Sequence, residues 1–181
     1  MLRTTLLFGL IAGLITAANS TVVLALGNPL GHGLVSALYG YLVMILALSL
    51  IFVGVKRLRD QAYGGIIRFG PALLAGLGIS AVAGLVYVIG WEITLAATHY
   101  GFADSYAAAT LQEAHARGAS AAEIATITAQ MQAFKVQYAD PLFRAPMTFV
   151  EIFPVGVLVS LVSAAVLCNS RFLPARRAVA A

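Results

Sequence analysis

The sequence has few charged residues. Only 10% of its 181 residues are Asp, Glu, Lys or Arg, and 61% are hydrophobic. An ordinary soluble domain has about 25% charged residues. Such a chain cannot cover a water-facing surface with charge, so the composition excludes an ordinary soluble protein. We therefore predict an integral membrane protein.

Cysteine is almost absent as well, because Cys168 is the only one. A single thiol cannot form an internal disulfide and has no second thiolate with which to hold a metal. We expect Cys168 to be a small core or lipid-facing residue. The three histidines, His32, His99 and His115, lie too far apart in the sequence for a helical metal-binding pair. We predict neither a metal site nor a cofactor.

Sequence motifs of enzymes and nucleic-acid-binding proteins are missing too. No G-x-S-x-G or S-x-x-K motif of a covalent hydrolase occurs, and no G-K-[ST] of a phosphate-binding loop follows Gly64-Gly65. The net charge of +4 lies in short segments beside apolar runs, not on a basic face with stacking aromatic residues. We expect a protein that is not an enzyme and binds no nucleic acid.

Four long apolar runs dominate what the sequence does contain. A helix needs about 20 residues to cross the hydrocarbon core of a bilayer, and each run reaches that length. The runs cover residues 6–26, 34–55, 69–98 and 147–168. A compact turn at 27–33 joins the first two, because Gly and Asn tolerate positive φ and Pro cannot continue a helix. We predict a single all-α membrane domain over residues 1–181, a bundle of four transmembrane helices.

The segment between the third and fourth runs is the only sizeable polar stretch. It predicts a helical hairpin over residues 104–139, in which Gly118 ends the first helix and a capping box, Ser120 to Glu123, begins the second. The second helix would have one apolar face, formed by Ile124, Ile127, Met131, Phe134 and Tyr138. We expect an amphipathic hairpin outside the membrane.

Positive charge is concentrated between the second and third runs, in residues 53–71, which we call the basic segment. Its cations are Lys56, Arg57, Arg59 and Arg68. Basic residues beside membrane helices stay on the cytoplasmic side. Arg171, Arg176 and Arg177 follow the fourth run without any acid. We therefore predict that both termini and the basic segment are cytoplasmic, with the basic segment in contact with anionic lipids.

Small residues recur four positions apart in three of the four runs. Within a bilayer such spacing marks places where helix backbones approach closely. The three ladders are Gly9, Gly13 and Ala17; Ala72, Gly76, Ser80 and Gly84; and Gly156, Ser160 and Ala164. We expect them to face either the interior of the bundle or the axis of a dimer.

Four segments of the sequence resemble a bacterial integral-membrane family, the domain of unknown function 4199. They are GYLVM at 40–44, SLIFVGVKR at 49–57, GGIIRFG at 64–70 and FVEIFPVG at 149–156. The resemblance covers most of the chain and is weakest in the hairpin. It implies a four-helix protein of a bacterial inner membrane, and it implies no activity.

Two acids, Glu92 and Glu151, lie inside the apolar runs. An ionisable residue in a membrane span is a functional candidate, because burying it is costly unless it is paired or hydrated. Counting along the helices places both acids in the outer third of the membrane, together with Asn19, Tyr41 and Tyr87. We predict one polar site there, in which paired carboxylates would share a proton or hold a cation. The alternative is that Glu92 faces headgroup water and Glu151 bonds a neighbouring helix.

Two functions remain open at this point, with an intramembrane enzyme as a less favoured third. The favoured one is non-enzymatic: association with a second copy or another membrane protein, or binding of a lipid or small ligand at the outer polar cluster. The other is a transporter or channel subunit in which Glu92 and Glu151 line a proton or cation path. The inner halves of all four runs lack acids, which disfavours transport.

Overall fold

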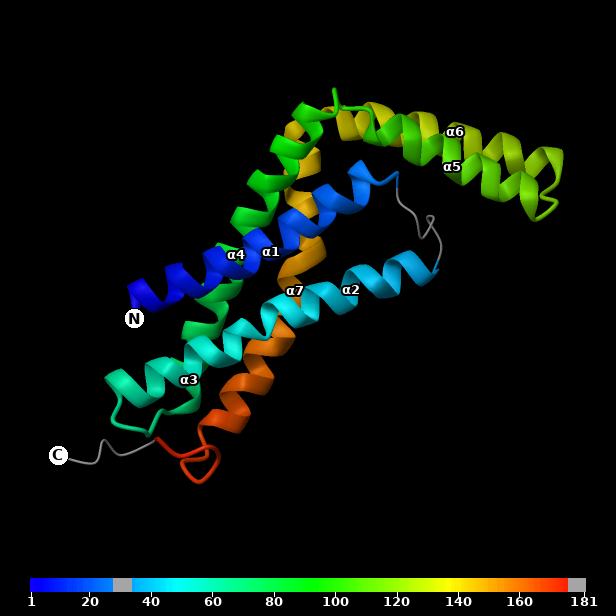
Figure 1. The fold of residues 1–181 in the computed structure, drawn as a ribbon. Coiled ribbons are helices and arrows are strands. Elements are labelled where there is room, and N and C mark those ends of the chain that lie inside the picture. The colour runs from blue at the N-terminus through cyan, green and yellow to red at the C-terminus, as the bar shows by residue number, and fades with distance from the viewer. Residues whose placement is uncertain (28–33, 176–181) are drawn as a thin grey trace.

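A computed structural model describes residues 1–27 and 34–175, and the described chain is entirely helical. The predicted turn beyond Gly27, with His32, and the cations Arg176 and Arg177 lie outside these ranges. The helices, shown in Figure 1, are α1 (Leu2–Ala25), α2 (Leu34–Leu48), α3 (Leu50–Ala62), α4 (Phe69–Ala97), α5 (Phe102–Ala116), α6 (Ala121–Ala139) and α7 (Pro141–Leu167).

Four helical stretches are long and apolar enough to cross a membrane, which confirms the predicted architecture of a multi-pass membrane protein. They are Leu2–Ala25, Leu34–Ala62, Phe69–Ala97 and Pro141–Leu167. The second stretch consists of α2 and α3, which meet at Ser49. The Oγ of Ser49 donates to the carbonyl oxygen of Leu46 at 2.6 Å, a local bond of the kind that often bends helices.

Three of these spans extend further than the apolar runs predicted. The first begins at Leu2 instead of residue 6. The second continues past Val55 to Ala62, where Lys56 Nζ binds Asp60 Oδ2 at 2.5 Å one turn along the helix and so supports its last turns. The fourth begins at Pro141 instead of residue 147. Asp140 is its N-cap, since Oδ1 accepts a hydrogen bond from the Leu142 N–H at 2.9 Å.

Helix α4 is the centre of the bundle, and α1 packs along one of its faces. The two helices run in the same direction. A Cβ atom on Gly9 would lie 2.6 Å from Val82 Cβ, and one on Gly13 would lie 2.6 Å from Val86 Cβ. Glycine is required at both positions because no side chain fits between these backbones.

Helix α7 packs antiparallel against another face of α4 through the other two ladders. A Cβ atom on Gly76 would lie 2.8 Å from Ser160 Cβ, and one on Gly156 would lie 2.7 Å from Ser80 Oγ. The hydroxyl oxygens of Ser80 and Ser160 are 3.1 Å apart, and both serines are buried. All three ladders therefore lie inside the bundle, which confirms the first of the two predicted locations.

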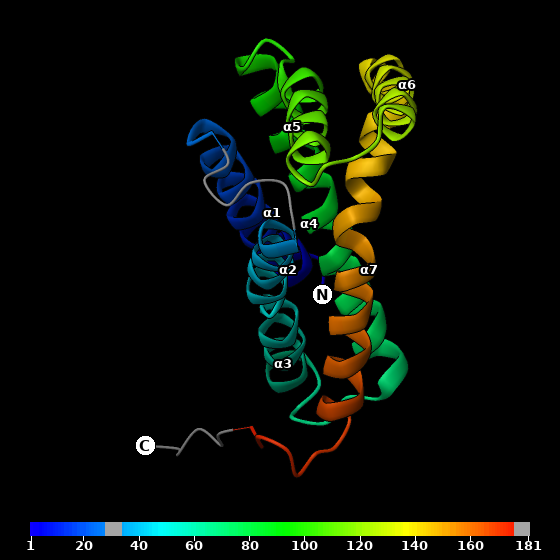
Figure 2. The same ribbon diagram turned by 90° about the vertical axis from the view of Figure 1, so that its right-hand side faces the viewer.

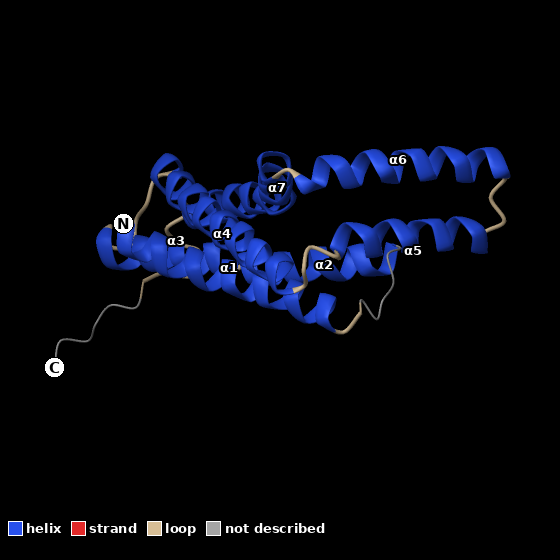
Figure 3. Ribbon diagram, turned by 90° about the horizontal axis from the view of Figure 1, so that it is seen from above, coloured by secondary structure: helices blue, strands red, loops and turns tan. Residues whose placement is uncertain are grey.

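The predicted hairpin is present as α5 and α6. Figure 3 shows these helices side by side and projecting beyond the bundle. Ser120 Oγ accepts from the Glu123 N–H at 3.3 Å, as the capping box predicts, and ion pairs join Arg117 to Glu123 and Lys135 to Asp104. We call this end of the bundle the hairpin end.

The opposite end, here the basic end, carries the basic segment and the chain that follows α7. In Figure 2 this chain passes below α3. Arg59 is 0% exposed and donates to the carbonyl oxygens of Phe172 at 2.9 Å and Leu173 at 2.5 Å. These hydrogen bonds hold the chain that follows α7 against α3, a role for Arg59 that the sequence did not predict. Arg57 and Arg68 remain exposed, and Lys56 is half-buried.

Candidate functional site

A cavity of about 940 Å³ lies at the hairpin end, between the membrane-spanning helices and the hairpin. Its volume falls in the range of about 300–1,000 Å³ that is usual for small-molecule sites. Six helices contribute to its walls, which are mostly apolar. The lining includes Ser20, Ser36, Ala37, Gly40, Tyr41, Met44, Tyr87, Trp91, Phe102, Tyr106, Met131, Phe134, Tyr138, Met147 and Glu151.

Small residues of α2 line part of the cavity. The buried residues of α2 are Met44, Ala47 and Leu48, all in its C-terminal half. Towards the hairpin end, Ser36, Ala37 and Gly40 line the cavity. A Cβ atom on Gly40 would meet no atom within 4 Å. Larger side chains on this part of α2 would fill the space.

Aromatic side chains from α4, α5 and α6 form one wall, which we call the aromatic wall: Trp91, Phe102, Tyr106, Phe134 and Tyr138. The Trp91 and Phe102 ring centroids are 5.1 Å apart with nearly perpendicular planes, and those of Phe134 and Tyr138 are also 5.1 Å apart. Trp91 Nε1 donates to Tyr138 Oη at 2.7 Å. Burial raises the pKa of the Tyr138 phenol, which favours its neutral form.

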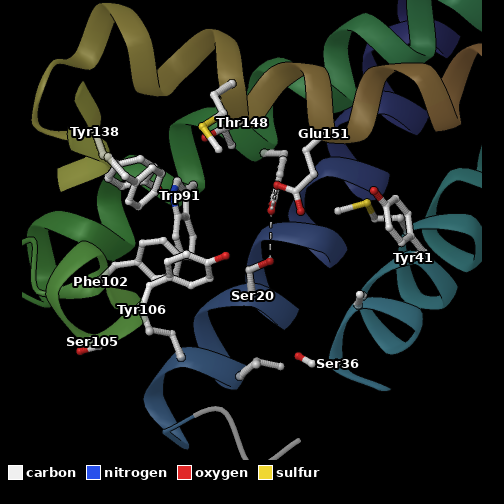
Figure 4. A pocket seen from close by; sticks show the side chains of 18 of the residues that line it. Ser20, Ser36, Tyr41, Trp91, Phe102, Ser105, Tyr106, Tyr138, Thr148 and Glu151 are labelled. Atoms are coloured by element: carbon white, nitrogen blue, oxygen red, sulfur yellow. Dashed lines mark hydrogen bonds between the residues drawn. The ribbon is translucent and has the colours of Figure 1, made fainter. Parts of the chain in front are cut away.

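Glu151 is the acid that lines the cavity. Figure 4 shows its side chain extending from α7 towards Ser20 of α1, with Tyr41 of α2 on one side and the aromatic wall on the other. Its Oε2 accepts a long hydrogen bond of 3.4 Å from Tyr87 Oη, which in turn accepts one of 3.5 Å from Ser20 Oγ. Among the described residues, the other carboxylate oxygen, Oε1, has no hydrogen-bond partner.

Glu92 has a different environment, because Arg144 binds both of its oxygens. Arg144 Nε donates to Oε1 at 2.7 Å and Nη2 donates to Oε2 at 2.6 Å. Arg144 is 3% exposed; its Nη1 donates to the Tyr138 carbonyl oxygen at 2.8 Å, and its guanidinium carbon lies 5.3 Å from the Tyr100 ring centroid. This arrangement is a bidentate ion pair that leaves the Glu92 carboxylate well satisfied.

The structure brings three of the five predicted polar residues together. Tyr41, Tyr87 and Glu151 line the cavity, whereas Asn19 and Glu92 are outside its lining. Asn19 Oδ1 accepts from Tyr39 Oη at 2.9 Å and so links α1 to α2. The two acids have different partners, and a site shared by Glu92 and Glu151 stays a prediction.

Sequence reasoning missed Arg144 and most of the aromatic wall. Arg144 precedes the apolar run that begins at residue 147, whereas Asp140-Pro141, a signal for a helix start, places it inside the fourth helix. Trp91, near the end of the third apolar run, contacts Tyr138 and Phe102 of the hairpin. Within residues 1–27 and 34–175, no three His, Cys, Asp or Glu residues form a group that could hold a metal ion.

Comparison with known proteins gives one family match. A family model described as "Protein of unknown function (DUF4199)" matches residues 7–169. This range contains all four segments that carry the resemblance noted in the sequence. The comparison with curated proteins gave no match, and neither did the comparison with solved structures.

Proposed function

This chain belongs to the DUF4199 family of proteins of unknown function, and we propose that it is a non-enzymatic membrane protein that binds a small apolar or amphipathic molecule in the cavity at its hairpin end. One observation carries the proposal: a cavity of about 940 Å³ combines a largely apolar lining with a few convergent polar groups. That combination is typical of small-molecule sites.

We place the protein in a bacterial inner membrane with the basic end in the cytoplasm. The exposed cations Arg57 and Arg68 lie at this end, and Arg171 follows α7 there. Positive charge of this kind beside short loops supports a cytoplasmic location. The hairpin end, and with it the cavity, would then face the other side of the membrane. Lipids would cover the exposed apolar faces of the spans.

Helices α1, α2, α4, α5, α6 and α7 of a single chain supply the described lining of the cavity. Ligand binding is therefore better supported than association alone. A transporter or channel role has less support, since Arg144 occupies both oxygens of Glu92 and leaves Glu151 as the acid that lines the cavity.

Fluorescence of Trp91 tests the proposal directly. Trp91 is the only tryptophan of the chain and lines the cavity, so its emission reports on occupancy. We expect dodecanol, added to the protein in dodecyl maltoside micelles, to change this emission in a saturable way.

A matched pair of glycine substitutions shows whether the signal comes from the cavity. Gly40→Leu places a large side chain at a position that lines the cavity, whereas Gly70→Leu makes the same change at a helical position outside the described lining. At both sites a Cβ atom meets nothing within 4 Å. We expect Gly40→Leu to weaken dodecanol binding and Gly70→Leu to leave it unchanged. Equal titration curves for the two variants would reject the proposed site.

A further inference from the structure

We propose that the ligand of this cavity is an amphiphile with a single ammonium group at its head and an apolar tail. The inference rests on the proposed function, to which it adds the charge of the ligand and the residue that recognises it. Charge, hydrogen bonding and the composition of the walls each support it.

The described lining of the cavity contains one charged side chain, Glu151, and no Lys, Arg or His. An amphiphile with a carboxylate or phosphate head would bring a second negative charge close to this acid, and like charges placed together in an interface repel each other. A neutral ligand would leave the acid without a counter-charge. A cation is the head group that complements the cavity.

The hydrogen bonding of Glu151 leaves room for such a cation. Glu92 has its counter-charge within the chain, in the bidentate pair with Arg144. Glu151 has only the 3.4 Å contact from Tyr87 among the described residues. Acids in membrane spans are usually paired. The contrast between the two acids indicates that the partner of Glu151 comes from outside the described residues, and we assign it to the ligand.

Polar and aromatic groups near Glu151 suit an ammonium in particular. An ammonium group donates three hydrogen bonds, and the oxygens of Ser20 and Tyr87 lie 3.5 Å from each other next to the carboxylate. Tyr41 lines the α2 side of the same space (Figure 4). A tyrosine ring attracts a cation within about 6 Å of its centroid. The head group would therefore lie between α1, α2, α4 and α7.

The rest of the cavity suits a tail without further polar groups. The indole N–H of Trp91 and the hydroxyl of Tyr138 bond each other at 2.7 Å, so this part of the aromatic wall satisfies its own polar atoms. Met131 and Met147 line the same cavity, and methionine adapts to irregular apolar ligands. The tail would lie along this wall.

The test compares three probes with the same chain length: dodecylamine, dodecanol and dodecanoate. Each is titrated into the protein in dodecyl maltoside micelles, whose heads carry no charge, at neutral pH. An amine with a pKa of about 10.4, as in lysine, is then charged. Trp91 fluorescence should give a dissociation constant for dodecylamine about tenfold or more below that for dodecanol. Dodecanoate should bind more weakly than either.

Two substitutions identify the acid responsible. Glu151→Gln should bring the dissociation constant for dodecylamine to within about twofold of that for dodecanol, because a hydrogen bond to a neutral amide adds less than one to a charged group. Glu113→Gln makes the same change on an exposed face of α5 outside the described lining, and it should keep the full preference for the amine.

The outcomes separate this inference from the proposed function. Saturable binding of dodecanol without any preference for the amine, or a preference that survives Glu151→Gln, overturns the inference and leaves the binding function in place. If neither dodecanol nor dodecylamine changes Trp91 emission in the wild-type protein, the proposed function is rejected as well. The comparison of probes in the wild type needs no variant, so it decides the matter even if Glu151→Gln does not fold.

Discussion

Arg144 joins the membrane bundle to the hairpin through one side chain. Its guanidinium binds the carboxylate of Glu92 in α4 and the carbonyl oxygen of Tyr138 in α6. Arg144 is almost completely buried. Removing one member of a buried ion pair leaves the other charge without compensation, and this is usually more damaging than replacing both.

We predict that Glu92→Gln lowers the free energy of unfolding by about 3 kcal/mol. This value is the lower end of the range for broken buried ion pairs, and we choose it because 29% of the Glu92 side chain is exposed. Reversible unfolding in mixed micelles measures this change. The control is Arg117→Gln, which breaks the ion pair to Glu123 on the hairpin surface and should cost at most about 1 kcal/mol. Similar losses in the two variants would contradict a structural role for the Arg144 pair.

At the scale of elements, the close approach of α1 to α4 leaves no room for a methyl group. A Cβ atom on Gly13 would lie 2.6 Å from Val86 Cβ and 2.7 Å from the Ala83 carbonyl oxygen. We predict that Gly13→Ala costs about 1–3 kcal/mol in unfolding free energy through overpacking. Gly70→Ala, in the open first turn of α4, should be neutral or stabilising because alanine favours the helix. Equal stability of both variants would show that this contact is looser than the structure indicates.

The connection between α4 and α5 contains two successive residues in the left-handed region, His99 with φ 55° and Tyr100 with φ 57°. Residues other than glycine lose about 1 kcal/mol or more in this conformation. We predict that His99→Gly raises the free energy of unfolding by up to about 1 kcal/mol. Ala96→Gly, within α4, should instead lower it by about 1 kcal/mol. A loss of stability in His99→Gly would mean that contacts of the imidazole stabilise the protein by more than the left-handed backbone conformation costs.

Local signals in the sequence predicted most of these elements. Four apolar runs define the spans, and the capping box at Ser120 begins α6 as expected. The start of α7 was placed too late, because hydropathy was given more weight than the Asp140 cap. Tyr41, Tyr87 and Glu151, which depth along the helices places at one level, line the same cavity. The aromatic wall depends on where the hairpin meets the end of α4, and the partner of Glu92 depends on the packing of α7 against α4. No local pattern in the sequence encodes either placement.

For the whole molecule, the proposed orientation makes a prediction that does not depend on the cavity. Ser120 in the hairpin and Gln61 at the basic end are both exposed. Cys168 is exposed as well, so single cysteines must be introduced in a Cys168→Ser background. In intact cells, Ser120→Cys should react with an impermeant thiol reagent and Gln61→Cys should react only after the membrane is permeabilised, because the basic end stays in the cytoplasm. Labelling of Gln61→Cys in intact cells would reverse the orientation.

The parallel packing of α1 against α4 also constrains how the protein is made. Two neighbouring spans that run in the same direction cannot be consecutive, so the ribosome must complete α2 and α3 before the partner of Gly9 and Gly13 exists. Until α4 leaves the translocon, the glycine face of α1 is covered only by lipid or by the insertion machinery. The α1–α4 interface can therefore be assembled only after α4 has been made, although α1 is synthesised before α2 and α3.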